Sequence, residues 1–273
     1  MENSCRWKKS RTVCNEEMSI IIYSCWKNRD MWEIFSILFN KYWKDCPFKI
    51  VLVTDKYTEQ NKRYVFDDIV VLDDTWGRMI KFAIERTATP YVMLWMDDYL
   101  ICDYVSNDEV LRQLVRMQES NAVNLRLTES PRCQGAYRGS TAIGYYESGM
   151  AYSISTQVGI WNAELLKYSI KDEWSAWDFE RIGSLKRIFY DSPILVSLDY
   201  EFPYEEGVRQ GKWMEQGVKL CKRNGIVLDK RKRPIMSNWE MAKVYFKGAI
   251  LDINPTLIVR LQNIIIHLKR THR

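Results

Sequence analysis

The chain has 273 residues and a formal net charge of +5, with 47% hydrophobic and 27% charged residues. This composition is ordinary for a globular protein and excludes a disordered, collagen-like or coiled-coil chain. The length suits one large domain or two small ones.

We expect neither a membrane-spanning helix nor a signal peptide. The sequence contains no run of about 18 consecutive apolar residues, which a transmembrane helix needs. Its first residues, MENSCRWKKSRTVCNEE, lack the apolar core of a signal peptide. The compartment that we predict is therefore the cytoplasm.

Histidine and cysteine usage limits the chemistry that is open to the chain. The two histidines, His267 and His272, lie close to the C-terminus, which excludes a His-based triad or metal site in the main body. Acid–base or metal chemistry there has to use carboxylates. The seven cysteines form no C-x-x-C pair, so they predict reduced thiols rather than a zinc cluster or a disulfide framework.

Basic residues gather toward the C-terminal end. From Arg209 onward there are 15 lysines and arginines against 4 aspartates and glutamates, whereas the rest of the chain is net acidic. This asymmetry indicates an anionic partner at that end, such as phosphate, a membrane surface or nucleic acid. The alternative is that the charges only keep the surface soluble.

The first half of the chain alternates strands and helices. Apolar, β-branched runs predict buried strands at Met18–Ser24, Phe48–Thr54, Asp68–Leu72, Tyr91–Met96 and Ala122–Leu127. Apolar residues spaced three and four apart predict helices at Asp30–Tyr42, at Trp76–Arg86 (capped by Asp74 or Thr75) and at Asn107–Ser120. This order, with nearly continuous apolar strands, is typical of an α/β fold whose mainly parallel central sheet is flanked by helices.

The second half is less regular. Residues 130–149 are rich in Gly, Ser and Arg and predict a long loop. Further on, we expect helices at Glu164–Tyr168, Ala176–Arg187 and Lys212–Arg223. We expect one more strand at Pro193–Leu198. With neither an internal repeat nor a flexible linker in sight, we predict one domain with a C-terminal appendage.

Ligands of parallel sheets bind beyond the carboxyl ends of the strands. Polar residues follow the predicted strands at Ser24 to Asp30, at Asp55 and at the pair Asp97-Asp98. The pair is the most informative, because two carboxylates leave the end of a buried strand. Such carboxylates can hold a hard divalent cation that bridges to substrate phosphates. A helix cap or a solvated turn is the alternative.

The stretch TWGRMIKFAIERTATPYVMLWMDDYL (75–100) resembles the central segment of GT-A glycosyltransferases. Gly77, Ala83, Pro90 and Tyr91 match the family layout that leads into an acidic metal motif at Asp97-Asp98. The family's D-x-D motif has its first aspartate where this chain has Trp95. The resemblance covers about residues 1–200 in element order and is specific around 75–100.

The resemblance implies a GT-A-like (Rossmann-like) fold that uses a nucleotide-sugar donor and a divalent cation, Mn²⁺ or Mg²⁺. Asp97 and Asp98 would hold the metal, and the donor would be bound by Ser24, Asp55, Arg78, Lys81 and Asp97. It divides the chain into a tail (1–16), a catalytic domain (17–205) and a basic helical C-terminal appendage packed on that domain (206–273). Within the domain, residues 17–127 would form the nucleotide-sugar half and residues 150–205 the acceptor half.

A second acidic segment lies at 152–184, where a Q-x-x-I-W stretch precedes the cluster E-W-S-A-W-D-F-E. It resembles the acceptor-side segment of bacterial capsular and surface-polysaccharide glycosyltransferases. The resemblance implies a general base, with Glu180 as first choice and Asp178 as second. Trp174 and Trp177 would stack on the acceptor sugar. The alternative is that both tryptophans belong to the core and that Glu180 forms a structural ion pair.

The basic end offers cations for the donor and a surface for a membrane. Arg209 and Lys212 lie in a stretch similar to the Q-x-x-R-W element of some polysaccharide-forming members, and would lie beside the leaving diphosphate. A basic run precedes Pro234, and Leu257–Arg273 predicts a basic amphipathic helix that can lie on an anionic membrane. A helix packed on the domain, with its basic face in water, is the alternative.

Two functions are consistent with these patterns. The first is a metal-dependent, inverting glycosyltransferase of surface-polysaccharide synthesis, acting on a glycan or lipid-linked acceptor in the cytoplasm or at the inner face of the plasma membrane. The alternative is a catalytically degenerate GT-A-like module that only binds at the membrane surface. A nucleic-acid partner is not expected, because no nucleic-acid-binding motif is present. A nucleotidyltransferase is disfavoured because residues 24–30 contain no glycine for a phosphate loop.

Overall fold

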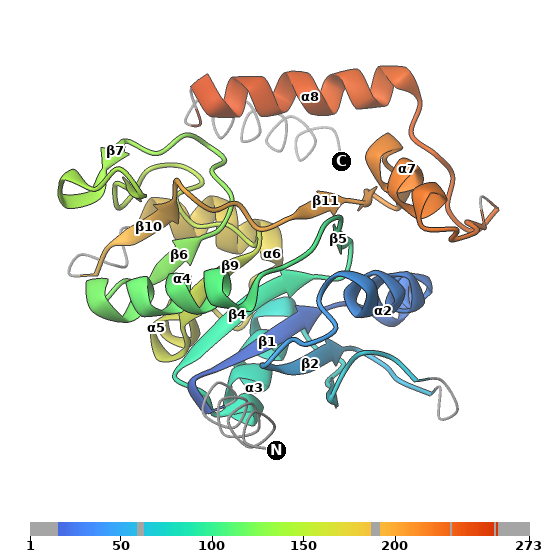
Figure 1. Ribbon diagram of the computed structural model, residues 1–273, viewed down its shortest axis with the longest axis horizontal. Helices are drawn as coiled ribbons and strands as arrows, with labels where there is room; N and C mark the ends of the chain where they lie inside the picture. The colour runs from blue at the N-terminus through green and yellow to red at the C-terminus, as the bar shows by residue number, and fades with distance from the viewer. Residues whose placement is uncertain (1–15, 59–62, 187–191, 230, 254, 256–273) are drawn as a thin grey trace, which may run out of the picture.

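A nine-stranded sheet forms the centre of the structure, a computed structural model that describes residues 16–58, 63–186, 192–229, 231–253 and 255 (Figure 1). Its strands lie in the order β3-β2-β1-β4-β9-β6-β10-β8-β7. They are β1 (Met18–Tyr23), β2 (Lys49–Thr54), β3 (Asp68–Val71), β4 (Tyr91–Met96), β6 (Asn124–Arg126), β7 (Gly135–Ala136), β8 (Ile143–Tyr146), β9 (Gly159–Asn162) and β10 (Ile194–Ser197).

Most strands of this sheet run in one direction. Strands β3, β2, β1 and β4 are parallel to one another, and β10 is parallel to β6. Strand β9 is antiparallel to both β4 and β6, and β8 is antiparallel to both β10 and β7. Of the nine strands, β8 and β9 alone therefore oppose the rest. The predicted α/β fold with a mainly parallel sheet flanked by helices is confirmed.

Helices cover both faces of the sheet, which is why its strands are continuous apolar runs. Side chains alternate between the faces along a strand. Ile20 and Ile22 of β1 therefore pack with α2 (Asp30–Tyr42) and α4 (Asn107–Ser120), whereas Ile21 packs with α3 (Trp76–Thr87) and α5 (Ala163–Ser169). The three helices predicted in the first half lie within one residue of their expected bounds.

The start of helix α3 is fixed by an N-cap residue and by the backbone of residues 171–174, which packs closely against it. The Thr75 hydroxyl oxygen accepts the Arg78 amide hydrogen at 3.4 Å, so Thr75 is the N-cap. The amide of Gly77 donates to the Trp174 carbonyl at 2.9 Å, and a Cβ at Gly77 would lie 2.1 Å from the Lys171 carbonyl oxygen. Glycine is needed here because the backbone of another segment packs against the helix.

The second half differs from the prediction in several places. Residues 130–149, predicted as a loop, contain the edge strand β7 and its neighbour β8, and the central strand β9 was not predicted. These strands are only two to four residues long, too short for a clear period-2 pattern. The predicted helix at Ala176–Arg187 is divided into α6 (Ala176–Asp178), a π-helical turn (Phe179–Gly183) and a 3₁₀ turn (Ser184–Lys186).

The C-terminal part of the chain returns to the end of the sheet at which strand β4 terminates. Strand β11 (Tyr204–Glu206) pairs with β5 (Tyr99–Ile101), and the hairpin of β12 (Val208–Arg209) and β13 (Lys212–Trp213) follows. Because Lys212 and Trp213 belong to this hairpin, the helix predicted at Lys212–Arg223 begins only at Glu215 and forms α7 (Glu215–Arg223).

Helix α8 (Asn238–Ile253), which was not predicted, lies beyond the sheet, at the top of Figure 1. Residues 1–15 of the predicted tail and the predicted helix Leu257–Arg273 lie outside the described residues. Within the described ranges, no helix has the length and apolarity needed to cross a membrane.

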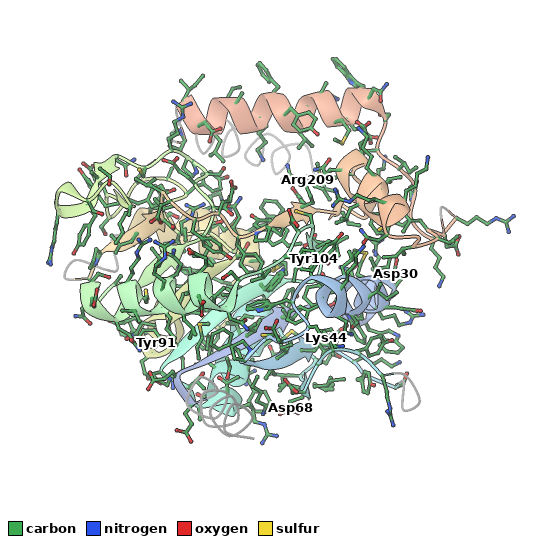
Figure 2. The ribbon with its side chains drawn as sticks, viewed as in Figure 1. Asp30, Lys44, Asp68, Tyr91, Tyr104 and Arg209 are labelled. Atoms are coloured by element: carbon green, nitrogen blue, oxygen red, sulfur yellow. The ribbon has the colours of Figure 1, made fainter. Side chains whose placement is uncertain are left out.

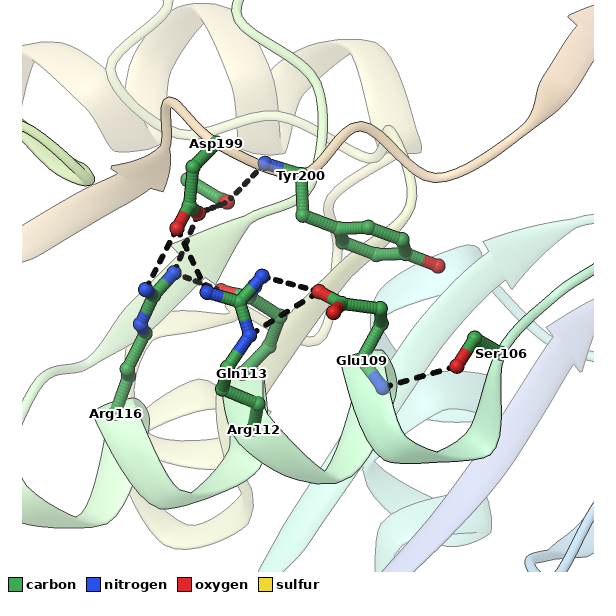
Figure 3. A network of polar contacts seen from close by, with 8 residues as sticks. Ser106, Glu109, Arg112, Gln113, Arg116, Asp199 and Tyr200 are labelled. Carbon is green, nitrogen blue, oxygen red and sulfur yellow. Dashed lines mark hydrogen bonds and ion pairs between the residues drawn. The ribbon is translucent and has the colours of Figure 1, made fainter.

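An arginine–carboxylate network fastens α4 to the segment that follows β10 (Figure 3). Asp199 accepts hydrogen bonds from Arg116 at 2.6 and 2.8 Å and from Arg112 at 2.7 Å. Arg112 also pairs with Glu109 of the same helix. Hydrogen bonds from Arg116, followed by those from Arg112, hold the pKa of the Asp199 carboxyl well below its usual range against the effect of burial.

We predict that Asp199→Asn lowers the free energy of unfolding by about 1 kcal/mol at pH 7, as expected for a partly exposed ion-pair network. Because the folded-state pKa of Asp199 is depressed, its contribution is fully present above its unfolded pKa of about 3.9 and is lost as pH falls further. Urea unfolding of both proteins between pH 3 and 7 measures this difference. Asp103→Asn, an exposed carboxylate outside the network, is the control, and an equal loss in both variants would contradict the prediction.

Candidate functional site

Asp97 is buried where β4 ends, with 3% of its surface exposed. Its amide donates to the Tyr23 carbonyl at 3.2 Å, next to the paired ends of β1 and β4. The Ser24 hydroxyl donates to Asp97 Oδ2, and the same hydroxyl oxygen accepts the Trp32 Nε1 hydrogen at 2.7 Å. Ser24, predicted to bind the donor, is therefore in contact with the predicted metal ligand and orients it.

The two neighbouring carboxyls both resist ionisation. Burial raises the pKa of Asp97, while the Ser24 hydrogen bond and the charge of Arg233 offset part of the rise. Burial, followed by the charges of Asp97 and Glu206, raises the pKa of Asp98 well above its usual range. Cation binding between them would relieve both the repulsion and the loss of hydration.

Arg209 lies beside Asp98 because β11 pairs with β5 and the Gly207 amide donates to the Asp98 carbonyl at 2.7 Å. Figure 2 shows Arg209 between α8 and the end of the sheet. Its guanidinium donates two hydrogen bonds to the Glu206 carboxylate, one of them from Nε to Oε1 at 2.5 Å. Its charge also lowers the pKa of Asp98 in part. The structure thus brings one of the two predicted C-terminal cations to the carboxylate pair.

Glu180, like Asp98, lies close enough to Tyr99 for its charge to reach the Tyr99 hydroxyl. The Tyr99 hydroxyl is influenced by both carboxylates: burial and then Tyr204, Asp98 and Glu180 raise its pKa well above its usual range. Oε1 of Glu180 accepts the Thr156 amide hydrogen at 2.7 Å, the Thr156 hydroxyl at 2.8 Å and the Ser155 hydroxyl at 3.1 Å. Within the described part of the chain, no donor bonds Oε2, so one oxygen is fixed and the other is available.

The second candidate base, Asp178, is used as a helix cap. Its carboxylate accepts the Ser175 amide at 3.2 Å and the Ser175 hydroxyl at 2.7 Å, while the Ser175 hydroxyl oxygen accepts the Asp178 amide. This is a capping box at the start of α6. Arg181 adds an ion pair at 3.5 Å. These bonds give Asp178 a structural task within its own turn.

The two tryptophans predicted to stack on the acceptor lie in different environments. Trp174 is 5% exposed and packs in the core cluster with α3, so its ring is not presented to a ligand in this structure. Trp177 is 63% exposed and lies three residues before Glu180. Of the two, Trp177 is the side chain that an acceptor can reach.

Asp55 follows β2 at the same edge of the sheet. Its Oδ1 accepts the Trp26 amide hydrogen at 2.5 Å and the Thr54 hydroxyl at 3.2 Å. Tyr23, which the sequence did not single out, is the last residue of β1 and pairs with Val53 of β2. Burial and then the charges of Cys25, Asp97 and Asp55 raise the pKa of Tyr23 to about 12. Tyr23, Asp55 and Asp97 therefore lie at the same end of the sheet.

Arg78 and Lys81 of α3 are engaged elsewhere. Arg78 forms an ion pair with Asp74 at 2.7 Å, and Lys81 forms one with Asp172 at 2.6 Å. In the described ranges, neither cation pairs with Asp97 or Asp98. Both pairs are partly exposed and local to the α3 start, so the structure does not bring these two predicted phosphate ligands to the carboxylates.

A cavity of about 1300 Å³ separates the start of α2 from the segment 210–234. Lys212, predicted to bind the donor, lines it and pairs with Glu240 of α8. Arg233 closes its inner end: the side chain is 7% exposed and donates to Asp30 Oδ1 at 2.9 Å and to Asn28 Oδ1 at 3.2 Å. Its charge reaches Asp97. The sequence signal for Arg233 was the basic run before Pro234, which gives no hint of burial.

The carboxylate pair suits a divalent cation whose coordination shell is completed by substrate atoms and water. In the described ranges, no group of three or more His, Cys, Asp and Glu side chains could hold a metal by itself. Mg²⁺-type sites, however, commonly use one or two protein carboxylates together with substrate phosphates and water. Two neighbouring carboxyls with raised pKa, buried Asp97 and half-buried Asp98, feel the charges of Arg233 and Arg209 and match that second arrangement.

Comparison with known proteins shows a likeness of fold. No family model and no curated protein matches the chain. It is similar to TarS 1-349 of S. aureus with UDP-GlcNAc (16% identity, TM-score 0.43, covering 72% of this chain and 60% of that one). It is also similar to a longer S. aureus TarS structure (13% identity, TM-score 0.47, covering 86% and 43%).

A third similar structure is the mannosyltransferase PcManGT from Pyrobaculum calidifontis in complex with GDP-Man and Mn²⁺ (11% identity, TM-score 0.47, covering 77% of this chain and 64% of that one). The chain therefore spans less than two thirds of the length of each of these three structures. At these TM-scores, the likeness says nothing of which residues act.

We predict that Asp97→Asn stabilises the protein at pH 8, on the order of 1–3 kcal/mol. The folded-state pKa of Asp97 is raised, so the wild type loses stability as pH rises from the unfolded value of about 3.9 toward the folded one. The gain of the variant should therefore shrink as pH falls toward 4. Urea unfolding at pH 4, 6 and 8, with Asp103→Asn as control, measures it. A variant that is less stable than the wild type at pH 8 would show that Asp97 is a structural carboxylate.

Proposed function

We propose that the chain is a glycosyltransferase that uses a nucleotide-sugar donor and a divalent cation, Mn²⁺ or Mg²⁺. One observation carries the proposal: the carboxyls of buried Asp97 and half-buried Asp98 lie at the end of a central parallel strand, with the charge of Arg209 acting on Asp98 and both Asp98 and Glu180 acting on Tyr99. Carboxylates, a cation and a separate candidate base are the groups that transfer from a sugar diphosphate needs.

The donor would lie over the ends of β1, β2 and β4. Asp55 and the 24–28 segment would contact the base and ribose, and Asp97 and Asp98 would hold the cation that neutralises the diphosphate as it leaves. Arg209 adds a fixed positive charge next to Asp98. Burial strengthens these interactions because little water is present to screen them.

The acceptor hydroxyl would approach Glu180, whose free oxygen Oε2 takes the proton. The acceptor oxygen then forms its bond to the anomeric carbon while the bond from that carbon to the diphosphate oxygen breaks. This direct displacement inverts the configuration. Oε1 is already held by three donors, which fixes the direction of Oε2 before the substrate arrives. Trp177 would offer its indole face to the acceptor sugar.

The acceptor that we propose is a glycan or a lipid-linked sugar of surface-polysaccharide synthesis. An apolar stripe on α8 supports a peripheral membrane contact: Trp239, Phe246 and Ile253, spaced seven apart, are 70%, 70% and 85% exposed. Together with the basic C-terminal quarter, this stripe suits an anionic membrane. The protein would then act in the cytoplasm or on the inner face of the plasma membrane, without a nucleic-acid partner.

A second candidate function is a binding module that keeps the fold without the chemistry. It is favoured by Trp95, which stands where the D-x-D motif has its first aspartate. Trp95 is fully buried, and its Nε1 donates to the Tyr99 carbonyl at 2.8 Å, so it serves the core. Metal-dependent donor binding and turnover distinguish the two functions.

We predict that one of UDP, GDP, CMP and dTDP raises the melting temperature and that the rise needs Mn²⁺, because ligands that bind only the folded state stabilise it. Asp97→Ala and Asp98→Ala should each abolish the Mn²⁺-dependent part. Asp103→Ala, an exposed aspartate of the same stretch, should keep it. If none of the four nucleotides shifts the wild type, the binding-only function is favoured and Asp97-Asp98 is an ordinary turn.

We predict that Glu180→Gln lowers turnover of the bound donor by about 10²–10⁴-fold, as expected when a general base is lost, with nucleotide affinity unchanged. Asp178→Asn is the matched control variant. It weakens the cap of α6, which should lower the free energy of unfolding by about 1 kcal/mol, and it should leave turnover within a few-fold of the wild type. Single-turnover assays together with calorimetric nucleotide binding give both quantities. The opposite ranking of the two variants would assign the base to Asp178.

A further inference from the structure

Arg126 is a fully buried arginine at the end of β6, with 1% of its surface exposed. Its Nη1 donates to the Tyr152 carbonyl at 3.0 Å, and its Nη2 donates to Gln157 Oε1 at 2.7 Å and to the Ser130 carbonyl. The guanidinium also lies over the Tyr146 ring, 4.8 Å from its centroid. All of these contacts are made with the segment between residues 130 and 157.

Among the described residues, no carboxylate forms an ion pair with this buried guanidinium. None of the ion pairs found among the described residues involves Arg126, and its Nε has no hydrogen-bond partner there. Burying an unpaired cation is unfavourable because the cation loses its hydration, and an apolar side chain of similar size has no such cost. The arginine therefore has a task other than stabilising the core.

That task is visible in the segment that Arg126 holds. Between the two anchored residues, Tyr152 and Gln157, lie Ser155 and Thr156, whose three donors fix Oε1 of Glu180. The Ser155 hydroxyl oxygen in turn accepts the Gln157 amide hydrogen at 3.1 Å. Arg126 therefore fastens both ends of the short loop that determines where the Glu180 carboxylate points.

A second contact ties this loop to the Glu180 turn itself. Ser184, which follows that turn, accepts the Ile154 amide at 3.0 Å and donates to the Ile154 carbonyl at 3.2 Å. The loop and the turn therefore move together. A shift of the loop away from Arg126 would carry the Oε1 donors with it.

We propose that Arg126 is a positioning residue for Glu180: through the 152–157 loop it aims Oε2 at the acceptor hydroxyl. This inference rests on the proposed function, because it takes Glu180 to be the base. Arg126 touches no substrate. Its planar fork holds several donors in a fixed, spread geometry, whereas a lysine offers three donors on one compact ammonium.

The test uses the full chain and a double-mutant cycle. Arg126→Met removes the fork at similar length, Arg126→Lys keeps the charge, and both are combined with Glu180→Gln. Arg116→Met is the matched control, because it breaks a partly buried arginine network that has no contact with Glu180. If Arg126→Met does not fold, Gln157→Met removes one of the anchored contacts instead. Mn²⁺-dependent hydrolysis of UDP-GlcNAc and GDP-mannose, in which water replaces the acceptor, reports turnover.

The expected result is a loss of hydrolysis on the order of 100-fold in Arg126→Met, a smaller loss in Arg126→Lys and donor affinity within about twofold of the wild type. When Glu180→Gln is already present, the Arg126 substitutions should not lower the rate of donor hydrolysis any further. The proposal would be overturned if the losses of hydrolysis from Arg126→Met and Glu180→Gln were additive in the double variant. A similar loss in Arg116→Met would also overturn it.

Amide hydrogen exchange supplies a readout that does not depend on activity. Arg126→Met should speed exchange at Thr156 and Ile154, whereas Arg116→Met should leave both amides protected. Unchanged protection in Arg126→Met overturns the positioning role even if neither donor is turned over. Faster exchange combined with full activity of Glu180→Gln shows instead that the loop is anchored as described and that the assignment of the base is wrong.

Discussion

Removing carboxyl groups from water at the end of a central strand is the constraint on which the rest of the site depends. Asp97 leaves β4 where three parallel strands end together, and the Ser24 hydroxyl, itself fixed by Trp32, holds it there. Left uncompensated, such burial favours the neutral acid. The neighbouring Asp98 and Glu206 add to the cost. The positive charges around the pair are therefore part of what makes the edge stable as well as part of what it can bind.

Those charges come from the far end of the chain. Arg209 reaches Asp98 because β11 adds to β5, and Arg233 reaches the Asp97 side because residues 224–229 and 232–234 lie against the start of α2. Lys247 of α8 is also near the site: burial and Arg209 lower its pKa, and Glu180 raises it in part. Three cations from the described part of this basic region therefore lie near the candidate site.

The sequence was sufficient for the parts of the structure that depend on regular patterns. Strands β1, β2, β3 and β4 and helices α2, α3 and α4 are continuous apolar runs or clear amphipathic stripes, and each lies close to its predicted bounds. The short strand β9 lacks such a pattern, although it occupies the middle of the sheet. Tertiary pairing determines its conformation, and local preference does not.

Among the site residues, the sequence could locate those that follow strands, because topology brings strand ends together. Ser24, Asp55 and Asp97 meet for this reason. It could not distinguish Arg209 from Arg78, since which cation finds a carboxylate depends on a hairpin and on a local ion pair with Asp74. Arg233 and Arg126 were beyond prediction as buried residues, because burial of an arginine depends on oxygens contributed by distant segments.

The distance along the chain between Asp97 and Arg233 has a consequence for synthesis. A ribosome adds roughly 5–20 residues per second, so the two are made on the order of ten seconds apart. During that interval the sheet edge that contains Asp97 lacks the cation from Arg233 that faces it in the finished protein. The carboxyl is then free to remain hydrated or to take up a proton. The order of translation thus places the electrostatic completion of this edge among the last steps of folding.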